Sequence, residues 1–298
     1  MLTGYRHPLY ATSLAEFGEP RELPCSGGWL LERTVPKYPD RDAMGSYPIF
    51  AASDWSGLGK DLGEIGPGLV SVALVADPFG EYLPHELSSW FDRVVAFKEH
   101  YAVDFLKPLL ISKHHRYYSR RAAADVTVDV GPPVDGFAAQ WSELYDSLVR
   151  RRQLKGIKAF SRASFEVQMK VPGMVVFRAM KNGELLGAHL WYQQQNVVYS
   201  HLAASTDQGY ELNSSYAIYS AVVEYFRSKV QWVDLGAGAG TTASQGGLSR
   251  FKAGWSNSTR PAYFCGRILN PERYEALTRA LCSDNTNYFP AYRRGELS

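Results

Sequence analysis

Residues 174–203 read MVVFRAMKNGELLGAHLWYQQQNVVYSHLA, and this stretch decides the fold. Three of its segments have the length and apolar, β-branched character of strands: Met174 to Met180, Leu185 to Tyr192 and Val197 to Ala203. The turn-forming pairs Asn182-Gly183 and Gln195-Asn196 separate them. The sequence therefore predicts an antiparallel meander of three strands.

Helical and strand patterns continue on the C-terminal and N-terminal sides of the meander. Before it, apolar residues recur every three or four positions from Phe137 to Leu148, as in an amphipathic helix. After it, we expect a helix over 214–228, strands over 232–235 and 262–268, and a helix over 271–282. This order of elements is typical of an acetyltransferase-like (GNAT) fold of the α+β class.

The N-terminal part of the chain predicts a second, smaller pattern. The first seventy residues read as loops with short strands. The segments that follow are predicted as a strand at 69–76, a short helix at 87–91, strands at 94–97 and 100–105, a basic helix at 111–124 and a strand at 126–130. Gly131-Pro132-Pro133 then breaks the pattern. We therefore predict two GNAT-like lobes, residues 1–130 and 131–298, each a mixed, mainly antiparallel sheet flanked by helices.

Composition excludes several classes of protein. With 298 residues, 45% hydrophobic and 21% charged, the chain has the composition of a folded globular protein. Three widely spaced cysteines suggest neither a disulfide framework nor a metal site. No apolar run is long enough to cross a bilayer, and the first ten residues lack a signal-peptide pattern. We expect a cytoplasmic protein that binds no metal.

Positive charge is concentrated in one part of the chain. The net charge is only +2, but between Lys107 and Arg162 eleven lysines and arginines face five acids. Such local excess favours a phosphate-rich partner. Two runs carry most of it: Lys113, Arg116, Arg120 and Arg121, and then Arg150, Arg151, Arg152, Lys155 and Lys158. A solvated helix face is the alternative for each run.

A glycine-rich segment, Val233 to Gly240, matches the first motif of methyltransferases that use S-adenosylmethionine. That fold needs several further strand-helix units after the motif, and only residues 241–298 remain. The preceding meander is also antiparallel in pattern. A glycine turn at the end of a strand, which would let a substrate lie close to the backbone, is the favoured interpretation.

Four motifs in series resemble those of the Fem-type aminoacyl-tRNA-dependent transferases. They are His201 to Ser205, the helix start Ser214 to Ala217, Val233 to Gly236, and Gly247 to Trp255, which reads GLSRFKAGW. The basic segment Ser112 to Ala122 is similar to the helix that ends the first lobe in that family. The resemblance covers about residues 69–270 and leaves the first seventy residues unexplained.

The resemblance implies transfer of an amino acid from its tRNA to an amine. The acceptor would be a small peptide or nucleotide-linked peptide, either in peptidoglycan precursors or in peptide antibiotics such as the uridyl peptides. Aminoacyl-tRNA would be the co-substrate, with no other cofactor. An acyltransferase that uses coenzyme A is the main alternative on the same fold. Enzymes that use coenzyme A bind its pyrophosphate with a glycine-containing turn before the central helix. The corresponding segment here, Gln208 to Ser215, lacks that motif, and Glu211 adds negative charge to it. A third alternative is a non-catalytic module that binds tRNA or a peptide.

Lys252 is the first candidate catalytic residue, because attack on an ester builds negative charge that a cation can stabilise. The family's Phe-Lys-x-x-Phe is Phe251-Lys252-x-x-Trp255 here. His201 is the second candidate catalytic residue and would act as a general base. The alternative interpretation is that it is a structural histidine bonded to a neighbour. Candidate substrate-binding residues are Arg250, Tyr216, Ser215, Glu224, Trp191, Lys113 and Arg116, and the second basic run, Arg150, Arg151, Arg152, Lys155 and Lys158, is expected to meet tRNA.

Overall fold

The computed structural model describes residues 1–238, 246–281 and 286–296. Contacts divide the chain into two compact units. Unit 1 comprises Met1–Gly4, Lys98–Leu154 and Ala159–Pro261, and unit 2 comprises Tyr5–Phe97, Lys155–Lys158 and Ala262–Ser298. This grouping differs from the predicted division at residue 130, because β6 (Thr127–Gly131) pairs with β7 (Met174–Lys181) across that point.

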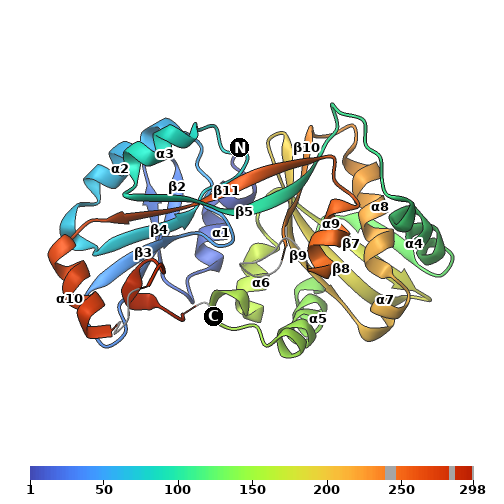
Figure 1. Cartoon of the computed structure of the whole chain (residues 1–298). Coiled ribbons are helices and arrows are strands. Elements are labelled where there is room, and N and C mark those ends of the chain that lie inside the picture. The colour runs from blue at the N-terminus through green and yellow to red at the C-terminus, as the bar shows by residue number, and fades with distance from the viewer. Residues whose placement is uncertain (239–245, 282–285, 297–298) are drawn as a thin grey trace. The chain divides into compact units, whose positions relative to one another are not determined.

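Unit 1 is built on a mixed sheet with strands in the order β5, β10, β9, β8, β7, β6 (Figure 1). The remaining strands span Arg93–Asp104 (β5, from residue 98 in this unit), Glu184–Gln194 (β8), Val197–Ser205 (β9) and Trp232–Ala237 (β10). Strands β7, β8 and β9 form the predicted antiparallel meander. β10 pairs parallel with β9 and antiparallel with β5. The two segments predicted as separate strands at 94–97 and 100–105 are one strand, β5.

Six helices are described in unit 1: α4 (Lys113–Ala123), α5 (Phe137–Arg152), α6 (Arg162–Gln168), α7 (Asp207–Glu211), α8 (Ser214–Phe226) and α9 (Gly247–Ala253). Helix α8 packs on the meander and has α4 beside it (Figure 1). Its buried face, with Ile218, Val222 and Phe226, joins Trp191 and Val198 in one core. Helices α5 and α6 pack together, and α5 also packs on β9. The amphipathic helices predicted around 137–148 and 214–228 are therefore confirmed.

The strands of unit 2 pair in the order β1 (Glu19–Leu23), β2 (Gly28–Thr34), β3 (Arg41–Gly45), β4 (Ser71–Val75), β11 (Ser258–Ile268, from residue 262 in this unit). Its helices are α1 (Pro8–Ser13), α2 (Leu58–Glu64), α3 (Pro84–Trp90) and α10 (Pro271–Leu281). Single 3₁₀ turns are η1 (Gly4–Arg6), η2 (Trp55–Gly57), η3 (Gly66–Gly68), η4 (Gly156–Lys158) and η5 (Ala291–Arg293).

The core of unit 2 gathers Leu30, Phe50, Val72 and Leu87. The first seventy residues were expected to be loops with short strands, and they also form α1 and α2. These helices have only six and seven residues, too few for a helical period to stand out in the sequence. Each unit is thus a mixed, mainly antiparallel sheet flanked by helices, as predicted for the α+β class. Among the described residues, no helix has the length and apolar character needed to span a bilayer.

Candidate active site

Lys252 lies on α9 in unit 1 and reaches the end of β10. Its Nζ donates a hydrogen bond to the Ala237 carbonyl oxygen at 2.6 Å. The residue before Ala237, Gly236, has φ of +75°, and a Cβ on it would lie 3.1 Å from the Lys252 Nζ. The glycine therefore gives β10 the left-handed turn and the open space that bring backbone and ammonium together.

Burial and neighbouring charges set the protonation of Lys252. Burial lowers the pKa of its ammonium to about 8, Asp234 opposes this shift, and the charge of Lys98 adds to it. The side chain is therefore mostly a cation at pH 7 and loses its proton as the pH rises through about 8. A half-buried cation of this kind is suited to stabilising a negative oxygen, because little water screens it.

Asp234, two residues before Gly236 on β10, is a buried carboxylate with two hydrogen-bonding neighbours. It is 3% exposed. Its oxygens lie 2.9 and 3.1 Å from the Nδ1 of His100, and one of them accepts the Gly236 N–H at 2.8 Å. The antiparallel pairing of β5 with β10 brings His100 beside Asp234, since Asp234 is opposite Ala102 and His100 is two residues from Ala102 along β5. A carboxylate on Nδ1 favours the tautomer in which Nε2 is the basic nitrogen.

His189 on β8 is a buried histidine close enough to Lys252 to feel its charge, and no pattern in the sequence pointed to it. It is 2% exposed, and burial, followed by the charge of Lys252, lowers its pKa to about 3. Its Nε2 lies 3.5 Å from the Oγ of Ser215 at the start of α8. The imidazole is therefore neutral at physiological pH, and the predicted Ser215 belongs to this cluster.

Three buried ring nitrogens around Tyr219 have no partner within the described part of the chain: His189 Nδ1, Trp191 Nε1 and Trp255 Nε1. Each of these rings lies within 6 Å of the Tyr219 ring, at 5.4, 5.9 and 5.8 Å. Buried polar atoms are normally paired, so groups of this kind mark places where a substrate atom or a water completes the hydrogen bonding. The predicted Trp191 therefore lies in the same cluster as Lys252.

Helix α4 fixes the segment that carries Lys252. His115 on α4 lies 2.8 Å through its Nε2 from the carbonyl oxygen of Phe251, and 2.6 Å through its Nδ1 from the Ser112 hydroxyl. A Cβ on Gly254 would lie 2.0 Å from the His115 ring, so only glycine fits there. The Phe251-Lys252-x-x-Trp255 motif is thus held by close packing between α4 and the end of α9.

His201, the other predicted catalytic residue, lies elsewhere in unit 1. Its Nε2 is 2.9 Å from Gln168 Oε1, and its ring packs on Tyr192 and Phe160. The preceding residue, Ser200, hydrogen-bonds Tyr219, so His201 points to the other face of β9. The catalytic role of His201 stays a prediction, and these contacts place it in the core near α6.

Acid stability offers a test of the His201 environment. Burial lowers its pKa to about 3, so between pH 6.5 and 3 the unfolded chain binds one proton that the folded chain does not. The free energy of unfolding should therefore fall with decreasing pH in this window. In His201→Gln, which can still donate to Gln168, urea titrations at several pH values should show this slope reduced by about 1.4 kcal/mol per pH unit.

The same substitution at exposed His85, on α3, is the matched control and should leave the slope unchanged. An unaltered slope in His201→Gln would contradict the buried, neutral state of His201. Turnover of the same folded variant at pH 7 tests the predicted catalytic role separately.

The other predicted substrate-binding residues lie on three helices. Arg250 and Glu224 are exposed, on α9 and α8 respectively, and Lys113 and Arg116 are exposed on α4. The Tyr216 hydroxyl lies 3.3 Å from His114 Nε2, and its ring contacts Phe251. Tyr216 is therefore the residue of this group that connects α4 to the cluster around Lys252.

The residues predicted to bind tRNA divide between the units. Arg150, Arg151 and Arg152 end α5 in unit 1, whereas Lys155 and Lys158 belong to unit 2. Arg151 forms an ion pair with Asp207 and stacks on the Tyr210 ring at 4.8 Å. Its charge is thus already neutralised, which weakens the case for this residue as a phosphate ligand.

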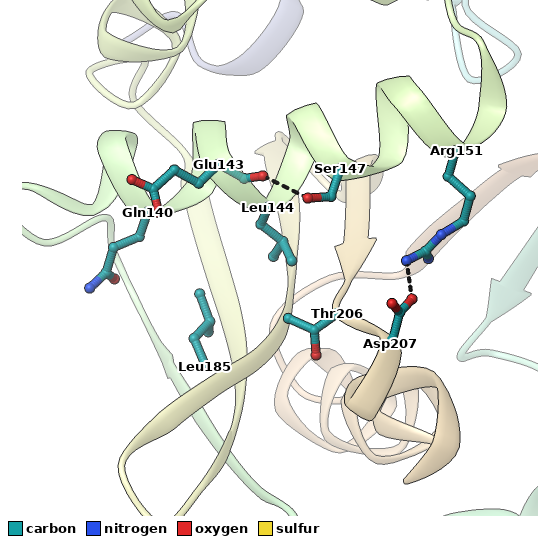
Figure 2. Close-up of a pocket in the computed structure, with 8 residues that line it drawn as sticks. All are labelled: Gln140, Glu143, Leu144, Ser147, Arg151, Leu185, Thr206 and Asp207. Atoms are coloured by element: carbon teal, nitrogen blue, oxygen red, sulfur yellow. Dashed lines mark hydrogen bonds and ion pairs between the residues drawn. The ribbon is translucent and has the colours of Figure 1, made fainter.

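A groove of about 440 Å³ runs along α5 (Figure 2). It is lined by Gln140, Glu143, Leu144, Ser147, Arg151, Leu185, Thr206 and Asp207. The Arg151–Asp207 ion pair closes one side of it (Figure 2). It shares no residue with the group formed by Lys252, Asp234, His189, Trp191 and Trp255. That group combines a half-buried cation, an acid and ring nitrogens without a partner in the described part of the chain, which makes it the better candidate active site.

Comparisons with known proteins bear on the fold. No known family profile matches the sequence, and no curated protein matches it either. Among solved structures, FemX is 13% identical with a TM-score of 0.66, over 90% of this chain and 92% of that one. L-PGS from Bacillus licheniformis is 13% identical with a TM-score of 0.61, over 91% and 94%.

A third structure is the C-terminal domain of a protein from Agrobacterium fabrum described as a lysylphosphatidylglycerol synthetase. It is 14% identical with a TM-score of 0.62, over 89% of this chain and 88% of that one. At such low identity the likeness concerns the fold. The chain therefore shares the fold of FemX, of L-PGS and of this synthetase domain.

Proposed function

We propose that the protein is an aminoacyltransferase that moves an amino acid from aminoacyl-tRNA to an amine. The observation that carries the proposal is the half-buried Lys252 cation at the end of β10, with Asp234 near it and, around Tyr219, three buried ring nitrogens that have no partner among the described residues. Two further lines support it: the Fem-type motifs in the sequence, and the fold shared with FemX and with a domain described as a lysylphosphatidylglycerol synthetase.

The reaction needs one stabilised oxyanion and one proton transfer. The amine attacks the ester carbonyl, a C–N bond forms, and the carbonyl oxygen becomes negative. Lys252 would stabilise that oxygen. The C–O bond to the tRNA ribose then breaks, and the ribose oxygen leaves as a hydroxyl by taking up the proton that the attacking amine has released. We assign the acceptance of the amine proton to His100 Nε2, because Asp234 holds Nδ1 and so leaves the basic lone pair on Nε2.

Coenzyme A as donor is the alternative on this fold, and the start of α7 argues against it. The N–H of Gly209 is bonded to Thr206 Oγ1 at 3.0 Å, and a Cβ on this glycine would lie 2.1 Å from the Leu186 carbonyl oxygen. Gly209 therefore serves close packing, and its amide already has a partner. This observation adds to the missing pyrophosphate motif and favours an aminoacyl ester as donor.

The proposal also specifies the class of acceptor and the cellular compartment. We infer a peptide or nucleotide-linked peptide acceptor, of the peptidoglycan or peptide-antibiotic type, in the cytoplasm. The experiment offers labelled amino acids loaded on tRNA to a panel of such amines and analyses the product. We expect a labelled product that survives mild alkali, as an amide does.

Product chemistry separates the alternatives. An alkali-labile product would point to a hydroxyl acceptor and contradict amide formation. A lack of product with every charged tRNA and every amine would contradict the proposed function itself, provided that a folded sample is confirmed by its thermal transition.

A further inference from the structure

Helix α4 carries an unneutralised strip of positive charge. Lys113, Arg116, Arg120 and Arg121 are exposed, and the helix contains no acid. Among the described residues none of the four forms an ion pair, in contrast to Arg151 on α5. Free surface cations of this density favour a polyanion, because each phosphate bound releases counterions.

Aromatic rings are interleaved with these cations. Tyr117 is 60% exposed and lies four residues after Lys113 and four before Arg121, so all three share one helix face. The Tyr117 ring lies 5.2 Å from that of Tyr118, which lies 4.6 Å from the ring of His114. Exposed rings between cations are the combination with which proteins bind single-stranded nucleic acid, through base stacking and phosphate contacts.

The ring contacts lead from this surface to the segment that carries Lys252. Tyr118 lies 5.2 Å from Tyr216 with the planes tilted by 33°, and Tyr216 lies 4.9 Å from Phe251. Phe251 directly precedes Lys252. The surface of α4 therefore borders the candidate active site within unit 1, where the esterified end of a tRNA would have to arrive.

We propose that the exposed face of α4 binds the single-stranded 3′ end of the donor tRNA, with a base stacked on Tyr117 and phosphates held by Lys113, Arg116, Arg120 and Arg121. The inference rests on the proposed function, because it places the donor of that reaction. A single strand is favoured over a duplex, since stacking on a protein ring requires an unstacked base.

Binding of uncharged tRNA to the full chain, followed by fluorescence anisotropy over a range of salt concentrations, tests this assignment. Tyr117→Ala should weaken binding by about tenfold at one salt concentration, as expected for the loss of one stacked base. Arg120→Gln with Arg121→Gln should weaken binding and reduce the slope of log K against log salt by about 0.7 for each phosphate that is no longer neutralised. Arg279→Gln, which removes one exposed positive charge from α10, is the control for a change of surface charge elsewhere on the chain and should bind as the wild type does.

Binding of a tRNA that lacks its single-stranded 3′ end tests whether Tyr117 contacts that end. On this probe, the wild type and Tyr117→Ala should bind with equal affinity. Wild-type affinity and salt slope in the α4 variants would overturn the proposal, as would a Tyr117→Ala defect that persists on the truncated tRNA. Weakened binding by the α5 variant Arg150→Gln with Arg152→Gln, and not by the α4 variants, would also overturn it and place tRNA at α5.

Transfer assays keep this inference separate from the proposed function. If charged tRNA is a donor and the α4 variants use it as well as the wild type, the surface assignment fails and the function stands. If the α4 variants lose tRNA binding but the wild type transfers no amino acid, the function fails and the surface assignment stands. Because the substituted side chains are exposed, thermal transitions of the variants should match the wild type.

Discussion

Lys252→Met should lower turnover by about a hundred- to a thousandfold while the chain stays folded. Methionine has a similar length and keeps the packing of α9, but it removes the cation that stabilises the oxyanion, and the loss of one such group typically costs this much. The fold should tolerate the change, because a neutral side chain needs no compensation for burial. The measurement is the transfer rate at saturating donor and acceptor, with the thermal transition recorded on the same sample.

A charge-conserving variant provides the control for this prediction. Lys252 is protonated below its pKa of about 8, so its contribution to the rate should be present below pH 8 and lost as the pH rises through it. In Lys252→Arg the guanidinium stays charged. Whatever rate that variant retains should therefore not show the fall near pH 8. A wild-type rate in Lys252→Met would remove Lys252 from the catalytic role.

Local patterns predicted much of the fold. The meander could be found because Asn182-Gly183 forms a turn in which both residues have positive φ, 51° and 85°, as the Asn-Gly pair favours. Helix α4 was predicted nearly to its bounds, and Ser112 caps it through the His115 N–H. By contrast, β5 was predicted as two strands, and a strand of twelve residues is longer than most.

The candidate site was only partly accessible from the sequence. Lys252 and Ser215 were found through motifs, but Asp234 and His100 are 134 residues apart and meet only through the pairing of β5 with β10. No local pattern contains that information. Asp234 was visible only as part of a glycine-rich segment, of which Ala239 and Gly240 lie outside the described residues.

The choice among histidines shows the same limit. His201 and His189 both lie in strands of the meander, and both are buried. Strand alternation assigns residues to two faces but does not say which face α8 covers. The register shift between Leu190 and Trp191, where β8 pairs with β9, further changes which residues stand opposite one another. The contacts of the folded chain place His189, and not His201, beside Lys252.

Donor dependence is the measurement that tests the central claim most directly. With a labelled amino acid, ATP, tRNA, an aminoacyl-tRNA synthetase and an amine acceptor, we expect product only when every component is present. Ribonuclease added before the protein should abolish transfer, because it destroys the ester donor, whereas ribonuclease added after the reaction should leave the amide product intact. Acetyl-CoA at the same concentration should not replace charged tRNA. Ribonuclease-resistant transfer that depends on coenzyme A would contradict the account and establish the alternative donor.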